Sequence, residues 1–202
     1  MDAPPDEQLL RDFLAGDGGG FELLARRHHA ELYQFAMRIT ASSAAAEDVV
    51  QETMLRVYLS ASSFDPERKF KSWLFAIAAN KARDYLRNRE RKHEVPLDGY
   101  AEDEQESGRR FVDLLSAEPI PQEDDLGTED RRRLVRSAIG LMPVKLREVL
   151  ILAYYHRFSY REIGDIVNIP VGTVKSRLHA AIVDFGGRYR AAVRQRMKNE
   201  HG

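Results

Sequence analysis

The 202-residue sequence contains no cysteine and no apolar run near the ~18 residues that a membrane-spanning helix needs. The absence of cysteine excludes disulfides and thiolate metal sites. The first ten residues, MDAPPDEQLL, are acidic and lack the basic start and apolar core of a signal peptide. With 43% hydrophobic and 31% charged residues, the composition is typical of a folded protein, and we expect it in the cytoplasm with no membrane span of its own.

Net charge is also nearly absent, at −1 with histidine neutral, but the charges are strongly segregated along the chain. Residues 1–67 carry a net charge of −7 and residues 68–93 a net charge of +7. Residues 94–130 then carry −11, and residues 131–202 carry +10. Local fields of this size matter more for choosing partners than the whole-chain isoelectric point does.

No stretch has a convincing strand pattern, and apolar residues recur at helical spacing over most of residues 6–93 and again from Thr128 onward. Residues 94–128 are rich in proline, glycine and acidic residues, which favours a mobile linker; within it, RRFVDLLSA is the one stretch that suits a short helix. We therefore predict an all-α protein with two small helical domains, 1–93 and 129–202. An acidic flexible linker, 94–128, joins them.

The segment SYREIGDIVNIPVGTVKSRLHAA predicts a helix, a tight turn and a second helix. Ser159 and Glu162 match a capping box, and residues 168–170 form the turn. On a wheel of about 100° per residue, the apolar side of the second helix lies opposite Gly172, Lys175, Ser176 and His179, with Thr173 and Arg177 on the flanks. Small hydrogen-bonding and cationic residues suit entry into a DNA major groove. The alternative is an ordinary amphipathic helix pair with a solvated face.

A second polar surface is expected on the helix predicted over residues 71–91. Its cations form a stripe with Asn80 and Asp84, opposite an apolar side. Such a stripe can follow a phosphate backbone, and the amide and carboxylate can hydrogen-bond an exposed base. The alternative is a solvated basic face. Trp73, the only tryptophan, is more typical of a core than of a stacking platform.

A third surface is expected on the helix predicted over residues 44–59, where acids and leucines share one side: Asp48, Gln51, Glu52, Leu55 and Leu59. This mixture favours a protein partner with a basic, partly apolar surface. The alternative is an ordinary surface helix whose exposed side binds no partner. Acid–base chemistry or a metal site is disfavoured because no histidine lies at ligand spacing. No glycine-rich phosphate loop or nucleophile motif is present. We expect no enzyme activity, no metal and no cofactor.

Three segments in this order carry a family resemblance: AEDVVQETMLRVY, FDPERKFKSWLFAIAANKARDYLR and LREVLILAYYHRFSYREIGDIVNIPVGTVKSRLHAA. Over about residues 6–93 and 129–185 the chain resembles an extracytoplasmic-function (ECF) sigma factor of the bacterial sigma-seventy family. The resemblance implies a dissociable subunit that binds core RNA polymerase, directs it to specific promoters and opens the minus-ten element. It also implies contact with the β subunit, and makes an anti-sigma factor an expected partner.

The resemblance further implies a role for individual residues. Docking on the clamp helices of the polymerase β′ subunit would use Asp48, Gln51, Glu52 and Arg56. Capture of the minus-ten non-template strand would use Lys71, Trp73, Asn80, Arg83, Asp84 and Arg87. Reading of the duplex minus-thirty-five element would use Arg161, Thr173, Lys175, Ser176, Arg177 and His179.

The sequence departs from the family pattern at three places. Residues 18–20 are glycines, which predicts a looser turn between the first helices. Ala180 and Ala181 stand where the family often has arginine, and Gly186 with Gly187 is expected to interrupt the last helix. Two other kinds of protein remain possible: a DNA-binding regulator of the LuxR type, which binds DNA by itself, and an adaptor whose basic faces bind acidic proteins.

Overall fold

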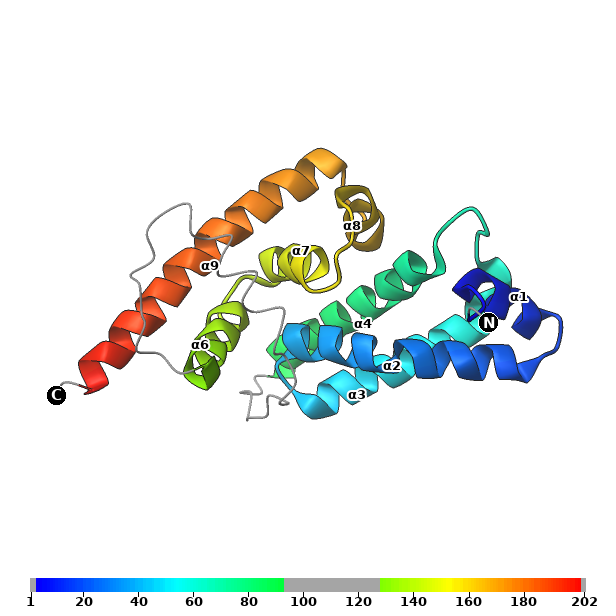
Figure 1. The fold of residues 1–202 in the computed structure, drawn as a ribbon, viewed down its shortest axis with the longest axis horizontal. Coiled ribbons are helices and arrows are strands. Elements are labelled where there is room, and N and C mark those ends of the chain that lie inside the picture. Colours follow the sequence, from blue (N-terminus) through cyan, green and yellow to red (C-terminus); the bar gives the residue numbers. More distant parts are fainter. Residues whose placement is uncertain (1–2, 93–127, 201–202) are drawn as a thin grey trace. The chain divides into compact units, whose positions relative to one another are not determined.

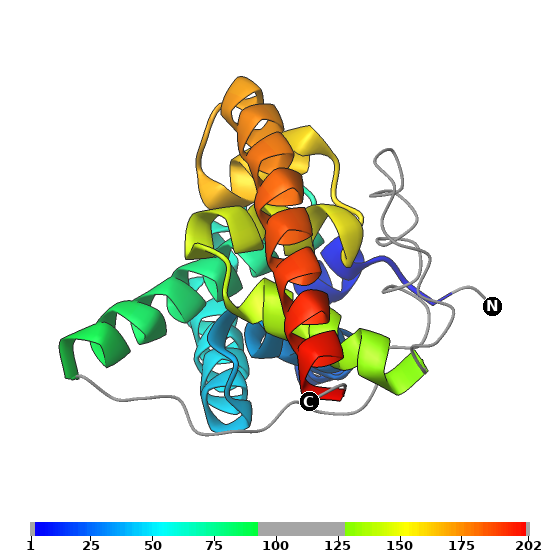
Figure 2. The ribbon, with the colours of Figure 1, turned by 90° about the vertical axis from the view of Figure 1, so that its left-hand side faces the viewer.

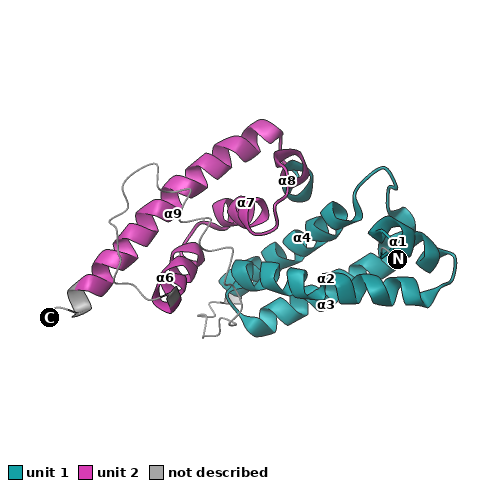
Figure 3. Cartoon of the chain, in the orientation of Figure 1, with its two compact units in different colours: residues 1–100, 164–168 teal, residues 101–163, 169–202 magenta. Residues whose placement is uncertain are grey.

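The computed structural model describes residues 3–92 and 128–200 (Figure 1). These residues form eight α-helices and one 3-10 helix and contain no strand, which confirms the all-α prediction. The chain divides into two compact units, residues 1–100 with 164–168 and residues 101–163 with 169–202 (Figure 3). None of the described helices is both long and apolar enough to cross a membrane. Apart from Thr128, the predicted acidic linker, including RRFVDLLSA, lies outside the described residues.

The first unit contains the helices α1 (Asp6–Leu14), α2 (Gly18–Thr40), α3 (Ser43–Ser60) and α4 (Phe70–Lys92), with a short 3-10 helix, η1 (Ala61–Ser63), after α3 (Figure 1). The long helix α2 contacts the three other α-helices. Ser42 caps α3 by accepting a hydrogen bond from the backbone N–H of Ala45. Large apolar side chains of α2 and α4, including Leu32, Phe35 and Phe75, are fully buried and form the core.

The glycines at 18–20 form the first turn of α2, with Asp17 as its N-cap. Only residues 15–17 separate α1 from α2, so the expected looser turn was wrong. The physical reason is a close approach of the two helices at Gly20. A Cβ at this position would lie 2.4 Å from the carbonyl oxygen of Leu9, so only glycine lets the chain turn back so tightly.

The helices after the linker are α6 (Thr128–Gly140), α7 (Val144–Tyr154), α8 (Tyr160–Val167) and α9 (Val171–Glu200). Pro143 is the N-cap of α7. The buried Arg147 closes the corner between α6 and α7, because its guanidinium donates to the carbonyls of Gly140 (2.8 Å) and Met142 (2.9 Å).

Helix α9 runs without a break through Gly186 and Gly187 (Figure 2), so the expected interruption was wrong. Packing accounts for the continuity. Tyr189 and Val193 are buried beyond the glycines, and α9 contacts α6. An ion pair of 2.8 Å between Arg196 and Asp130 fastens the end of α9 to the start of α6. Tertiary contacts thus outweigh the low helix propensity of the glycine pair.

Candidate nucleic-acid and protein interfaces

Helix α3 presents an exposed side in which carboxylates precede leucines. Val50 and Val57 turn inward and are buried. The side chains of Leu55 and Leu59 are on the outer side and are 54% and 66% exposed. We define the α3 surface as the exposed residues Asp48, Gln51, Glu52, Leu55, Arg56 and Leu59. Large apolar side chains this open to solvent, next to acidic ones, are typical of a surface that binds another protein.

Tyr58 extends this surface and was missed in the sequence analysis. Its ring is half exposed, and its inner side packs against Phe13 of α1 and Phe21 of α2, with ring centroids 5.1 Å and 5.3 Å apart. These contacts pack the C-terminal half of α3 against α1 and α2. The periodicity of α3 alone could not reveal them, because the partner rings come from distant parts of the sequence.

Helix α4 brings four of its predicted residues onto one continuous surface. Asn80, Asp84 and Arg87 are exposed and Arg83 is half buried. The Arg83 guanidinium donates to the side-chain oxygen of Asn80, and that of Arg87 pairs with the Asp84 carboxylate. We call Asn80, Arg83, Asp84 and Arg87 the α4 surface. Its cations are held in place by side chains one turn earlier in the same helix.

The other two residues expected on this side behave differently. Lys71 lies nine residues before Asn80, so at about 100° per residue it is half a turn away. Its ammonium pairs with Glu31 of α2 at 2.6 Å and lies 5.8 Å from the centre of the Phe75 ring. The structure therefore does not bring Lys71 to the α4 surface. Trp73 does lie on the same side as Asn80, two turns earlier, and is half buried against Phe64.

Helix α8 begins with the predicted capping box. The backbone N–H of Ser159 donates to Oε2 of Glu162 at 2.8 Å, and the N–H of Glu162 donates to Oγ of Ser159 at 3.3 Å. Arg161 is exposed in the first turn. The turn after α8 contains Asn168 with φ of 54°, a left-handed conformation that asparagine tolerates better than most residues. The helix, turn and helix follow the predicted order.

The outward side of the first turns of α9 matches the sequence analysis. Lys175, Ser176 and His179 are exposed, as is Gly172, which leaves space for a close approach. Thr173 and Arg177 are half buried on the flanks, while Val174, Leu178, Ala181 and Phe185 turn inward. We define the α9 surface as Thr173, Lys175, Ser176, Arg177 and His179. Ala180 is exposed, so this surface ends without the cation that the family often has there.

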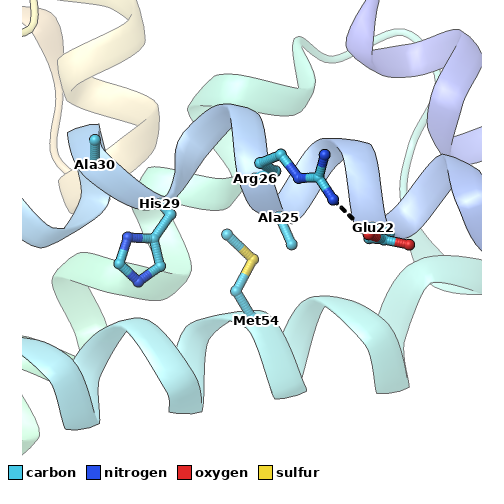
Figure 4. Close-up of a pocket in the computed structure, with 6 residues that line it drawn as sticks. All are labelled: Glu22, Ala25, Arg26, His29, Ala30 and Met54. Carbon is cyan, nitrogen blue, oxygen red and sulfur yellow. Dashed lines mark hydrogen bonds and ion pairs between the residues drawn. The ribbon is translucent and has the colours of Figure 1, made fainter.

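A hollow of about 470 Å³ lies between α2 and α3 (Figure 4). Its lining consists of Glu22, Ala25, Arg26, His29 and Ala30 of α2 and Met54 of α3. The lining is largely apolar, and the Glu22 and Arg26 side chains pair with each other at 2.6 Å. In the described part of the chain, no group of three or more His, Asp or Glu side chains could hold a metal ion.

Two family models match the chain, one on each side of the predicted linker. Sigma-70 region 2 matches residues 24–92, which include α3 and α4. Sigma-70 region 4 matches residues 132–184, which include α7, α8 and the first half of α9. The three surfaces defined above thus fall inside the two matched regions.

Similar proteins cover nearly the whole chain. The ECF RNA polymerase sigma factor SigW of Bacillus subtilis (strain 168) is 34% identical, over 86% of this chain and 90% of its own. The ECF RNA polymerase sigma-E factor of Escherichia coli (strain K12) is 30% identical, over 87% of this chain and 90% of its own. The solved structure of CnrH in complex with the cytosolic domain of CnrY is 25% identical, with a TM-score of 0.66 over 92% of this chain and 97% of CnrH.

Proposed function

Since the chain belongs to the ECF family of RNA polymerase sigma factors, we propose that it carries core polymerase to its promoters through three separate surfaces. Residues 1–93 hold the polymerase and the minus-ten element, and residues 129–202 hold the minus-thirty-five element. No covalent chemistry is involved. The family is one of transcription regulators, and the three surfaces described above perform binding alone.

The α3 surface binds the polymerase. Its carboxylates attract a basic partner, and Leu55 and Leu59 supply apolar area that desolvates on contact. The clamp helices of the β′ subunit are the partner that family membership suggests. Because the acidic and apolar parts follow one another along α3, they fix the direction in which a partner helix lies.

The α4 surface captures the minus-ten strand as the duplex opens. Unpairing a base costs roughly a few kcal/mol, and contacts to the exposed base and its phosphate offset that cost. Asn80 and Asp84 supply hydrogen-bonding groups, and Arg83 and Arg87 supply cations for the backbone. Trp73, on the same side of the helix, contacts the same strand in this proposal.

The α9 surface enters the major groove of the minus-thirty-five element. A helix with Gly172 in its first turn can approach base edges closely, and Lys175 has the reach to contact them. Arg161, exposed on α8, makes a phosphate contact in this proposal. Polymerase holds the two DNA-binding parts at a set spacing. Their effective concentration for the promoter is therefore higher than in the free protein, where a linker joins two weakly binding parts.

A protein inhibitor regulates this factor in the proposal. CnrH, a structural relative, is seen in complex with the cytosolic domain of CnrY. A protein inhibitor needs to cover only the α3 surface or the α9 surface, because losing either contact stops initiation.

The proposal depends on one observation: an exposed acidic and apolar helix face and two cationic helix faces occur in a chain that matches both sigma regions. Run-off transcription with purified core polymerase on a library of candidate promoters tests it. New initiation that requires both core and this protein supports the proposal. Tight DNA binding by the protein alone, without initiation, is the result expected of a LuxR-type regulator. If the protein neither supports initiation nor binds DNA tightly by itself, the remaining interpretation is an adaptor that binds acidic proteins.

A further inference from the structure

One ion pair in the first unit joins the α3 surface to α4. The ammonium Nζ of Lys81 lies 2.7 Å from Oε2 of Glu52, and the two residues are 29 positions apart in the sequence. The side chains of Lys81 and Glu52 are 33% and 57% exposed, so the pair is open to competing partners. Glu52 is one of the carboxylates proposed to bind polymerase.

Lys81 is placed to serve the α4 surface, although the sequence analysis did not include it. It directly follows Asn80, and Asp84 lies between the two around the helix, about 40° from Asn80. A lysine stem is long and flexible, so its ammonium can exchange one oxygen ligand for another without any movement of the helix. A DNA phosphate beside Asn80 and Asp84 offers such an oxygen.

We propose that Lys81 is a further phosphate-binding residue of the α4 surface. In the free protein its ammonium is paired with Glu52, and the ammonium becomes available to a phosphate when Glu52 binds the polymerase. This inference rests on the function proposed above. A basic side chain of the polymerase competes with Lys81 for the Glu52 carboxylate. A phosphate competes with Glu52 for the Lys81 ammonium.

The two competitions favour each other. Whichever ligand arrives first separates the pair, and the second then binds without that cost, so each raises the affinity for the other by the same factor. Exposed ion pairs are weak, and the corresponding factor is about two- to fivefold. The free factor therefore binds single-stranded DNA more weakly than the polymerase-bound factor does. The cause is the Glu52–Lys81 ion pair, which lies within the first unit.

The test measures binding of a short fluorescent single-stranded oligonucleotide to the full-length protein by anisotropy at low salt. Glu52→Gln removes the partner of Lys81. The matched control is Glu47→Gln, which removes the same charge from the same helix, where the carboxylate lies 3.9 Å from His29 of α2. Glu52→Gln should raise the affinity about two- to fivefold more than Glu47→Gln does.

A second variant shows whether Lys81 carries the effect. Lys81→Met keeps most of the stem and removes the ammonium, so in this background Glu52→Gln and Glu47→Gln should have equal effects. In a plot of log affinity against log salt concentration, Lys81→Met alone should also make the negative slope shallower by about 0.7, the value expected for the loss of one phosphate contact to a single strand. A merely structural role for Lys81 would leave that slope as it was.

Equal effects of Glu52→Gln and Glu47→Gln in the wild-type background overturn the inference, as does a Glu52→Gln gain that persists with Lys81→Met. Circular dichroism melts of each variant confirm that the affinities come from folded protein. The run-off assay is independent of these outcomes. Initiation without the Glu52→Gln gain removes only this inference, and the gain without initiation removes only the proposed function.

Discussion

The carboxylate of Asp6 accepts a 2.7 Å hydrogen bond from Nε2 of His28, and this contact ties α1 to a buried ring of α2. Its other oxygen pairs with Arg27 at 2.6 Å. Burial opposes ionisation of Asp6, but the hydrogen bonds and positive charge of His28 and Arg27 outweigh it and hold the pKa of this carboxyl below its ordinary value of 3.8. The N-terminal helix is thus fastened by a charged contact between residues 22 positions apart.

We expect Asp6→Asn to lower the free energy of unfolding by about 1–2 kcal/mol at neutral pH, because it removes the charge from a partly buried network. Since the folded-state pKa lies below the ordinary one, the stabilisation is complete above pH 3.8 and is lost as the pH falls through the lowered pKa. Urea melts at several pH values measure both effects. The control is Glu22→Gln, which breaks an ion pair whose side chains are 71% and 76% exposed and should cost almost nothing. Equal losses for the two variants would contradict the assignment.

Two glycines should respond in opposite directions to alanine. Gly187→Ala fills open space in the middle of α9 and should stabilise the protein by about 0.5–1 kcal/mol. Gly20→Ala places a methyl group against the Leu9 carbonyl and should destabilise it by at least about 1 kcal/mol, because backbone has to move. Thermal melts of both variants compare them directly. Stabilisation by Gly20→Ala would show that α1 and α2 are not in close contact there.

Reversing the charge of the α3 surface should abolish polymerase binding. Asp48→Arg combined with Glu52→Arg turns two exposed carboxylates into cations, which a basic partner repels, while the buried side of α3 is untouched. Co-purification with core polymerase measures binding, and a melt confirms the fold. Glu22→Arg, an exposed change on α2, is the control and should still co-purify. Unaltered co-purification of the double variant would remove α3 as the docking helix.

Lys175→Ala distinguishes a base contact from a phosphate contact on α9. A base contact predicts a loss equivalent to about 1–3 kcal/mol on cognate promoters and relaxed specificity at one position. A uniform loss across promoters, with a smaller salt dependence, would instead assign Lys175 to the backbone. Promoter-library transcription measures the difference. Arg194→Ala, an exposed cation near the other end of the same helix, is the control and should leave the promoter ranking unchanged.

The acidic segment at residues 94–128 should weaken DNA binding by the free protein. Its negative charge can screen the α4 surface and the α9 surface from DNA until the polymerase binds the segment. Deleting residues 94–128 should therefore strengthen binding of the polymerase-free protein to promoter DNA, most strongly at low salt. An electrophoretic mobility series against salt measures this. Unchanged affinity at all salt concentrations would show that the segment screens nothing.

Local signals in the sequence were sufficient for the presence of most helices and for the outward side of the first turns of α9. The capping box of Ser159 and Glu162 needs residues only three apart, and the exposed side of α9 follows from a periodicity that the helix itself imposes. The family resemblance, carried by the same local motifs, is confirmed by matches over most of the chain. The separate roles of the site residues stay predictions that the experiments above address.

Tertiary structure alone decided what depends on contacts between distant residues. It paired Lys71 with Glu31, joined Lys81 to Glu52, and placed Gly20 against Leu9. It also carried α9 through Gly186 and Gly187, because buried side chains further along the helix offset the poor propensity of the glycines. A single sequence records which side of a helix is apolar, but the identity of the side chain that meets it across the core is set only when the helices pack.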